Sequence, residues 1–326
     1  MLIAADIGGT HARLALYDHG AGRPRQVVAH DYPTHAAPSF DAVLDAFLRD
    51  AADGARIEAA GIAVAGPVIA QQATLTNLGW KVQAAALAAR LGTPHVRLLN
   101  DLEALATAVP VLRDDELVTL HDGHPDEAGN AAVIAAGTGL GQAMLPRIDG
   151  RLRVLASEGG HADFAARSAE EWALAEFLTA REGRAQVEHV LSGPGLKRLH
   201  AFTHQALTCR AGIEGTEPDT PAQVSAAALE GRCDGCVDAL ALFVAALGAE
   251  AGNLALRSTA TAGLFVGGGI APRILPALQS GRFMDAFLAK APMEALVARV
   301  PVRVIVNGDA GLLGAAVAAA ALLNQP

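Results

Sequence analysis

The sequence predicts an α/β protein, because strand-like and helix-like segments alternate along its 326 residues and one supersecondary plan occurs twice. The chain is 52% hydrophobic and 18% charged, which is ample for a packed core and predicts two domains or one large one. The repeated plan is an apolar strand, a glycine turn and a second apolar strand, at residues 2–18 and 131–147. This repetition indicates two related lobes.

Composition excludes several classes of protein. The formal net charge of -9 provides no basic surface for nucleic acid, so we expect no nucleic acid partner. Three cysteines, an odd number, argue against a disulfide framework and predict a cytoplasmic protein. Asp6 interrupts the apolar N-terminus, which also lacks the basic region of a signal peptide. Residues 311–324 are shorter than the ~20 residues that cross a bilayer, so we expect a buried helix and no membrane partner.

The first half of the chain is predicted as a hairpin followed by alternating helices and strands. Residues 11–17 alternate in a strand pattern after the glycine turn at Gly8 and Gly9, which predicts the hairpin. The further elements expected are a loop at 21–25, a helix at 39–52, a strand at 57–69, a helix at 81–92, a strand at 96–99 and a helix that follows it.

A polar surface loop is predicted at 121–130, early in the second domain. The elements expected after the repeated plan at 131–147 are a helix at 170–182, a turn at 191–195, helices near 221–229 and 237–256, a strand, glycine loop and helix over 263–278, and a last strand and helix over 302–321.

Three glycine-rich turns follow predicted strands, namely Gly8-Gly9-Thr10, Gly137–Gly141 and Gly267–Gly269. Glycine lets backbone N–H groups converge on a phosphate without a side chain in the way. The P-loop pattern is absent, and the middle loop fails G-x-G-x-x-G because Gln142 stands at the last glycine position. One such loop would be an ordinary tight turn, but three in one chain favour phosphate binding.

Asp6 places a carboxylate inside the first apolar strand, two residues before Gly8. A carboxylate there is either satisfied by hydrogen bonds or holds a cation. Mg²⁺ uses few carboxylates and keeps several waters, so Asp6 predicts a Mg²⁺-nucleotide site that it reaches through water. The alternative is a turn aspartate that caps its own backbone.

Asn100 and Asp101 end the apolar strand at 96–99. Asn100 followed by Glu103 fits a helix N-cap with its reciprocal acid, which needs no chemistry. Asp101 would then gain only a few tenths of a kcal/mol from the helix dipole. Because ligand crevices open at the carboxyl ends of strands in α/β sheets, Asp101 is also predicted as a base beside a bound substrate.

The segment SEGGHADF places Glu158 and His161 on either side of two glycines. A carboxylate beside an imidazole suits hydrogen bonding to the vicinal hydroxyls of a sugar, and Glu188 offers a similar group. The alternatives are an exposed turn or a structural hydrogen bond to the histidine. Zinc is not favoured, because it needs three or four ligands and Cys233-x-x-Cys236 lacks a second pair.

A set of motifs occurs in order along nearly the full chain: DIGGTHARLALYD, TNLGW, LLNDLEALA, AAGTGLGQA, EGGHADF, VLSGPGL, GGGIAPRIL and GLLGAA. As a set they resemble the bacterial glucokinase family of the actin, hexokinase and chaperone ATPase superfamily. The related repressor and kinase family carries a cysteine-rich zinc motif after its Glu-Gly-His turn, and this sequence has no such cluster near Glu158 to His161. His11 departs from the family pattern, which has Asn there, and this bears on the range of sugars.

The resemblance implies two actin-like, ribonuclease H-like lobes with the active-site cleft between them, the smaller formed by 1–110 with 310–326 and the larger by 111–309. It implies that Asp101 is the catalytic base and Asp6 the Mg²⁺ ligand. The residues implied to bind ATP are Asp6, Ile7, Gly8, Gly9, Thr10, Gly137, Thr138, Gly139, Gly268 and Gly269. Those implied to bind glucose are Asn100, Asp101, Glu158, His161 and Glu188.

The implied reaction is phosphorylation of the glucose 6-hydroxyl by ATP, with the two lobes closing on the sugar. The expected cofactors are ATP and Mg²⁺, and the expected assembly is a homodimer. Two alternatives stay open at this point: a kinase for another hexose, such as mannose, fructose or an amino sugar, and a catalytically silent sugar sensor on the same scaffold.

Overall fold

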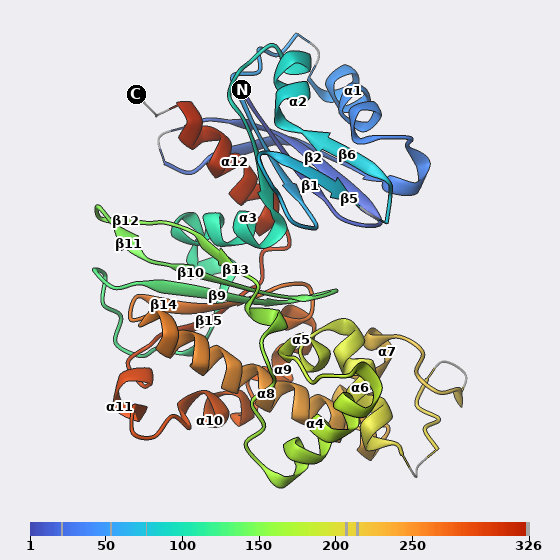
Figure 1. Cartoon of the computed structure of the whole chain (residues 1–326). Helices are drawn as coiled ribbons and strands as arrows, with labels where there is room; N and C mark the ends of the chain where they lie inside the picture. The colour runs from blue at the N-terminus through green and yellow to red at the C-terminus, as the bar shows by residue number, and fades with distance from the viewer. Residues whose placement is uncertain (21, 53, 76, 206–207, 213–214, 324–326) are drawn as a thin grey trace. The chain divides into compact units, whose positions relative to one another are not determined.

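The computed structural model describes all residues except 21, 53, 76, 206–207, 213–214 and 324–326. The chain divides into two compact units, the first formed by Met1–Arg113 with Asn307–Pro326 and the second by Asp114–Val306. Each unit has its own sheet (Figure 1). Each also has its own hydrophobic core. Residue 76 of the TNLGW motif and residue 324 of the last apolar stretch lie outside the described residues.

A five-stranded sheet of order β3-β2-β1-β4-β7 forms the centre of the first unit. Its strands are β1 (Leu2–Ile7), β2 (His11–Asp18), β3 (Arg25–Pro33), β4 (Ala59–Val64) and β7 (Val96–Asn100). The pairs β1·β2 and β2·β3 are antiparallel, which confirms the predicted hairpin, whereas β4 and β7 run parallel to β1. The register aligns Ile7, Val64 and Asn100, so the segments after β1 and β7 leave the same end of the sheet.

A two-stranded ribbon, β5 (Gln72–Leu75) with β6 (Trp80–Gln83), precedes the helix α2 (Ala84–Leu91). The sequence prediction of a helix from residue 81 is wrong over 81–83. Burial alternates along β6, with Trp80 and Val82 buried and Lys81 and Gln83 exposed, which is the period of a strand. The helix begins only where the alanine-rich segment starts.

Helices cover both faces of the first sheet. On one face α1 (Phe40–Ala51) and α2 pack their apolar side chains against alternate residues of β1 and β4. On the other face α12 (Ala310–Leu323) packs against β1, β4 and α3 (Asp101–Ala108). This packing depends on two glycines, because a Cβ at Gly61 would lie 1.9 Å from the Ala315 carbonyl oxygen and one at Gly314 would lie 1.7 Å from that of Ala104.

A six-stranded sheet of order β13-β10-β9-β14-β15-β8 forms the centre of the second unit. Its strands are β8 (Leu117–His121), β9 (Ala131–Ala136), β10 (Leu140–Leu145), β13 (Leu155–Ser157), β14 (Gly263–Gly267) and β15 (Val302–Ile305), with a small ribbon of β11 (Arg147–Ile148) and β12 (Arg151–Leu152). The strands β10-β9-β14-β15 repeat the pattern of β2-β1-β4-β7: an antiparallel hairpin followed by two parallel strands. The predicted internal repeat is therefore confirmed.

The long helix α8 (Asp234–Ser258) is the main apolar element of the second unit and packs against β9, β10 and β14 (Figure 1). It is long and apolar enough to cross a membrane, but most of its apolar window is buried in this core. The other helices of the unit are α4 (Ala169–Glu182), α5 (Val187–Val190), α6 (Gly193–Thr203), α7 (Pro221–Leu229), α9 (Leu275–Leu278), α10 (Arg282–Leu288) and α11 (Glu294–Val297).

The predicted turn at 191–195 is wrong in part, because 193–195 form the first turn of α6. The Ser192 hydroxyl accepts a hydrogen bond from the Gly195 N–H at 3.0 Å, so serine is the N-cap. Pro194 is tolerated in this first turn, where its missing N–H costs no helical hydrogen bond.

Candidate active site

The first glycine loop joins β1 to β2 as a tight turn. The Gly8 N–H donates to the His11 carbonyl at 2.9 Å, and the Thr34 hydroxyl donates to the Gly9 carbonyl at 2.9 Å. A Cβ at Gly9 would meet nothing within 4 Å, and Gly9 is not among the residues with positive φ. Neither packing nor backbone conformation therefore requires glycine at this position, whereas close approach of a ligand would require it. The Ile7 side chain is fully buried, so only its backbone can face a ligand.

Asp6 lies at the end of β1, on the face of the sheet covered by α12. A Cβ at Gly311, in the first turn of α12, would lie 3.1 Å from Asp6 Oδ2. The pKa of Asp6 is raised to about 6, chiefly by burial and also by the charges of Asp101 and Asp309, while Arg13 opposes these effects. Arg13 is itself bound to Asp309. This grouping has more carboxylates than cations, and a bound cation would relieve their repulsion.

Asn100 and Asp101 begin α3 at the carboxyl end of β7. Asn100 Oδ1 accepts a hydrogen bond from the Leu102 N–H at 2.8 Å, and its amide donates to the Gly66 carbonyl at 3.1 Å. Asn100 is thus the predicted N-cap. The capping pattern predicts that Glu103 accepts a reciprocal hydrogen bond from the backbone N–H of Asn100. In the structure, Glu103 accepts a hydrogen bond from the Arg97 side chain at 2.7 Å.

Asp101 is an exposed residue at the first position of α3. Asp101 Oδ1 accepts a hydrogen bond from the Leu102 N–H at 2.8 Å, which the helix supplies. This bond fixes the orientation of the carboxylate. A carboxylate oriented at the carboxyl end of a parallel strand can accept a proton from a substrate hydroxyl.

The second glycine loop joins β9 to β10 and is held by the helices that follow it in sequence. The Gly193 N–H donates to the Gly137 carbonyl, and Glu188 Oε2 accepts from the Leu140 N–H, both at 2.8 Å. A Cβ at Gly139 would lie 2.6 Å from Glu188 Oε2, whereas one at Gly137 would meet nothing. Glu188 therefore fixes the loop, Gly139 permits its approach, and Gly137 has no structural reason to be glycine.

The turn at 158–161 packs on the start of β10. A Cβ at Gly160 would lie 2.1 Å from the Leu140 carbonyl oxygen, so glycine is required there. His161 Nδ1 lies 2.8 Å from Gln186 Oε1, and His161 Nε2 lies 3.9 Å from Glu158 Oε2. The Glu158 side chain is 84% exposed. The structure thus gathers Glu158, His161 and Glu188 around the first residue of β10 and leaves a carboxylate and an imidazole facing solvent.

The third glycine loop follows β14 and lies against the end of β9. Gly268 has φ +84°, and a Cβ there would lie 2.2 Å from the Ala136 carbonyl oxygen, which also accepts from the Ile270 N–H at 3.2 Å. Gly269 has open space where its Cβ would be. The second and third loops therefore leave the same end of the second sheet as neighbours.

Sequence reasoning missed the residues that support these groups. Arg13 and Asp309 are 296 positions apart in the chain, yet they bind each other, and the charges of both affect Asp6. Gln186 lies 2.8 Å from His161 and 2.9 Å from His189, so it orients both imidazoles. No local pattern in the sequence marks any of these three residues.

Known proteins resemble this chain in sequence and in fold. A sequence model of the family described as Glucokinase matches residues 3–322. A glucokinase of Synechocystis sp. is 39% identical over 98% of this chain and 97% of its own length. The crystal structure of glucokinase from an Antarctic psychrotroph is 33% identical, covers 99% of each chain and gives a TM-score of 0.87.

A ROK family glucokinase from Streptomyces griseus, solved in complex with glucose and AMPPNP, shares the fold at 24% identity, with 98% of each chain covered and a TM-score of 0.64. The chain has the actin-like ATPase fold of these sugar kinases. Because a family model matches residues 3–322 and a relative of similar length is 39% identical, the chain belongs to the glucokinase family.

Proposed function

We propose that Asp101 is the general base in the reaction that family membership gives this chain, the phosphorylation of glucose by ATP. The observation that carries this role is the place of Asp101 at the carboxyl end of β7, with one oxygen held by the Leu102 N–H. As the glucose 6-oxygen attacks the γ-phosphorus, its proton passes to the Asp101 carboxylate and the bond from the γ-phosphorus to ADP breaks. Catalysis of this kind depends mainly on positioning, for which an oriented carboxylate is suited.

The sugar is proposed to bind Asn100, Glu158, His161 and Glu188 beside Asp101. The hydrogen bond from His161 to Gln186 fixes the imidazole ring, and the exposed Glu158 carboxylate can accept from two hydroxyls. Glu188 already accepts from the Leu140 N–H, so it can connect a sugar hydroxyl to the second glycine loop. A turnover assay over glucose, mannose, fructose and glucosamine tests the sugar range.

ATP is proposed to bind the three glycine loops through backbone N–H groups. Three glycines support this assignment: Gly9, Gly137 and Gly269. A Cβ at these positions would meet no protein atom within 4 Å, so packing does not explain glycine there, whereas close approach of a phosphate would. The other proposed contacts are Asp6, Ile7, Gly8, Thr10, Thr138, Gly139 and Gly268.

Mg²⁺ is proposed to be held by Asp6, through water. The carboxylates that surround Asp6 and raise its pKa fit a cation. When bound, the ion would neutralise charge on the ATP phosphates.

The decisive experiment is a coupled assay of ADP release by Asp101→Asn with Mg²⁺-ATP and glucose. Asparagine can still accept the Leu102 hydrogen bond, so the variant should fold and bind glucose, while its kcat falls by at least about 100-fold because the base is gone. Glu103→Gln on the same helix is the matched control and should keep most of its rate. If Asp101→Asn turns over glucose nearly as fast as the parent chain, the base is another residue.

We also propose a cytoplasmic homodimer. The three free thiols of Cys209, Cys233 and Cys236 fit a reducing compartment. Light scattering on the purified chain tests the dimer.

A further inference from the structure

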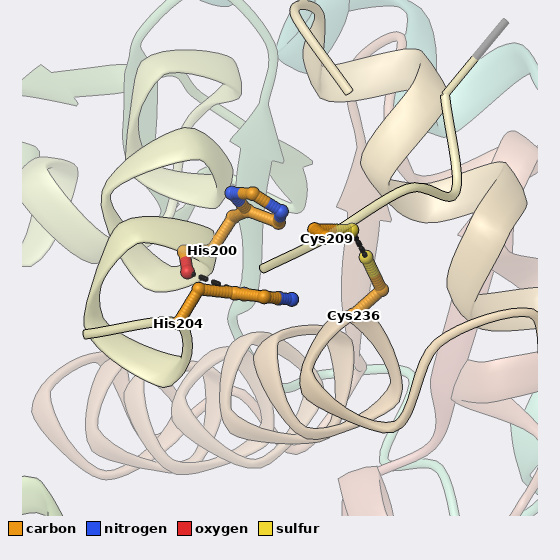
Figure 2. A group of neighbouring side chains, drawn as sticks. All are labelled: His200, His204, Cys209 and Cys236. Atoms are coloured by element: carbon orange, nitrogen blue, oxygen red, sulfur yellow. Dashed lines mark hydrogen bonds between the residues drawn. The ribbon is translucent and has the colours of Figure 1, made fainter. Parts of the chain in front are cut away.

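Five metal-binding side chains converge in the second unit, in a place that the proposed reaction does not use. His200 lies on α6, His204 ends that helix, Cys209 follows in the connection to α7, and Cys233 and Cys236 lie at the start of α8. One ligand atom from each of His200, His204, Cys209 and Cys236 lies within 4.8 Å of the others. Figure 2 shows the two imidazole rings lying one above the other and extending toward the two sulfur atoms.

The sulfur–sulfur distances within this cluster match the edges of a zinc tetrahedron. Zn–S bonds of about 2.3 Å and Zn–N bonds of about 2.0 Å place neighbouring ligand atoms roughly 3.5–3.8 Å apart. The Cys209 sulfur lies 3.6 Å from that of Cys233 and 3.7 Å from that of Cys236, and His204 Nε2 lies 3.2 Å from the Cys233 sulfur. A small movement of the side chains would bring all four atoms around one ion.

The His204 ring is held in the orientation that a metal ligand needs. Its Nδ1 lies 2.8 Å from the His200 carbonyl oxygen, to which it donates, so the lone pair is on Nε2 beside the Cys233 sulfur. Metal-binding histidines commonly donate their other ring N–H to a backbone carbonyl in this way. Gly235 makes room for the ring, because a Cβ there would lie 2.6 Å from His204 Cε1.

His200 closes the cluster on one side. Its ring stacks on that of His204 with centroids 4.0 Å apart, and its side chain is 5% exposed. Within the part of the chain that the structure describes, His200 Nε2 is buried without a hydrogen-bond partner. A buried polar atom in this state is uncommon in a protein, and strain, a functional role, or a bound water or ion beside it can account for it.

Cys233 is the N-cap of α8, where the positive end of the helix dipole stabilises an anionic ligand.

We propose that Cys209, Cys233, Cys236 and His204 bind one Zn²⁺ ion, with His200 as a positioning residue that orients His204. A disulfide would need only two cysteines and no histidine, whereas this cluster brings three thiols and an oriented imidazole to one point. The bound ion would join α6, the connection after it and α8. Its role is to stabilise the second unit, and it takes no part in phosphoryl transfer.

Zinc content of the untagged chain is the first test. Atomic emission on protein purified without chelator should give about one zinc per chain, and cobalt substitution should give the absorption of tetrahedral cobalt with thiolate ligands. Cys209→Ser and His204→Ala should lose both signals, while His35→Ala, an exposed histidine of the first unit, should keep them. His200→Gln should keep the cobalt spectrum but bind the ion more weakly.

A ligand variant that fails to fold would lose zinc through misfolding and not through loss of the ligand. A second test therefore uses the parent chain alone. Blocking the thiols of the parent chain with a mercurial should release zinc into a chromogenic indicator in proportion to the thiols blocked. Removing zinc with a chelator should lower the melting temperature by at least about 5 °C, and adding zinc should restore it.

Two results would overturn the proposal. One is a parent chain that contains no zinc and takes up neither zinc nor cobalt when they are added after reduction. The other is a thiol titration under non-reducing conditions that finds one free thiol per chain and no metal, which would make the cluster a disulfide.

Discussion

At the scale of single residues, Asp6 is a carboxylate whose buried environment opposes its charge. The pKa of Asp6 is about 6 in the folded chain against 3.8 for the free side chain. The folded state therefore binds the proton more tightly than the unfolded state, so this group's contribution to stability is present at low pH and lost as pH rises toward 6. In Mg²⁺-free buffer, Asp6→Asn should become more stable relative to the parent chain between about pH 4 and pH 7, by at most about 3 kcal/mol.

Urea unfolding at several pH values checks this expectation. Asp31→Asn is the control, because Asp31 pairs with the same Arg13 at 3.5 Å but is exposed. A difference between Asp6→Asn and the parent that stays constant over this pH range would contradict the raised pKa.

Individual site residues could be predicted only where their own neighbours in sequence carry the signal. Asn100 was predictable as an N-cap because the cap and the start of its helix are adjacent. Arg13 and Asp309 were not, because their contact joins residues 296 positions apart. Gln186 was not predictable for the same reason, because only the fold places the imidazoles of His161 and His189 beside it.

At the scale of elements, the glycine loops contain two physically different kinds of glycine. Gly268 is required by its φ of +84° and by the Ala136 carbonyl, so Gly268→Ala should destabilise the fold by about 2 kcal/mol or more. Gly9 has open space, so Gly9→Ala should keep its stability within about 0.5 kcal/mol but raise the KM for ATP by about tenfold or more, because the methyl group would occupy the phosphate position.

Thermal unfolding and initial rates with varied ATP separate these two effects. Gly20→Ala, in the turn after β2, also has open space and should change neither quantity. A normal KM for ATP in Gly9→Ala would remove the first loop from the nucleotide site.

Elements were predicted best where one periodicity held over a whole segment. The hairpin at 2–18 and the helix α1 follow such patterns. A helix was wrongly predicted at residues 81–83, because the alanine-rich run that follows them has a strong helical pattern and the strand there has only four residues. The sequence did not favour zinc at Cys233 and Cys236, because His200, His204 and Cys209 precede them by more than 20 residues and only folding brings α6 and the start of α8 together.

At the scale of the whole molecule, the first unit is built from two distant parts of the chain. The helix α12 covers one face of its sheet, against Gly61 of β4. A chain that ends at Val306 should therefore lose the fold of residues 1–113, because the sheet would expose that apolar face, while the second unit should remain folded.

Limited proteolysis with mass spectrometry checks this expectation, with early cleavage within residues 1–113 and a protected fragment from the second unit. Removing only residues 324–326, which follow α12, is the control and should leave the cleavage pattern unchanged. Equal protection of both units in the shortened chain would show that α12 is dispensable.

The return of α12 to the first unit also sets an order of events at the ribosome. Residues 1–113 emerge before the second unit, yet the helix that completes their packing is translated after it. Until α12 emerges, the nascent first sheet carries an uncovered apolar face, and the second unit, which is continuous in sequence, can reach its native state before the first. The emergence of α12, and not that of the first hundred residues, is therefore the step that allows the first unit to mature.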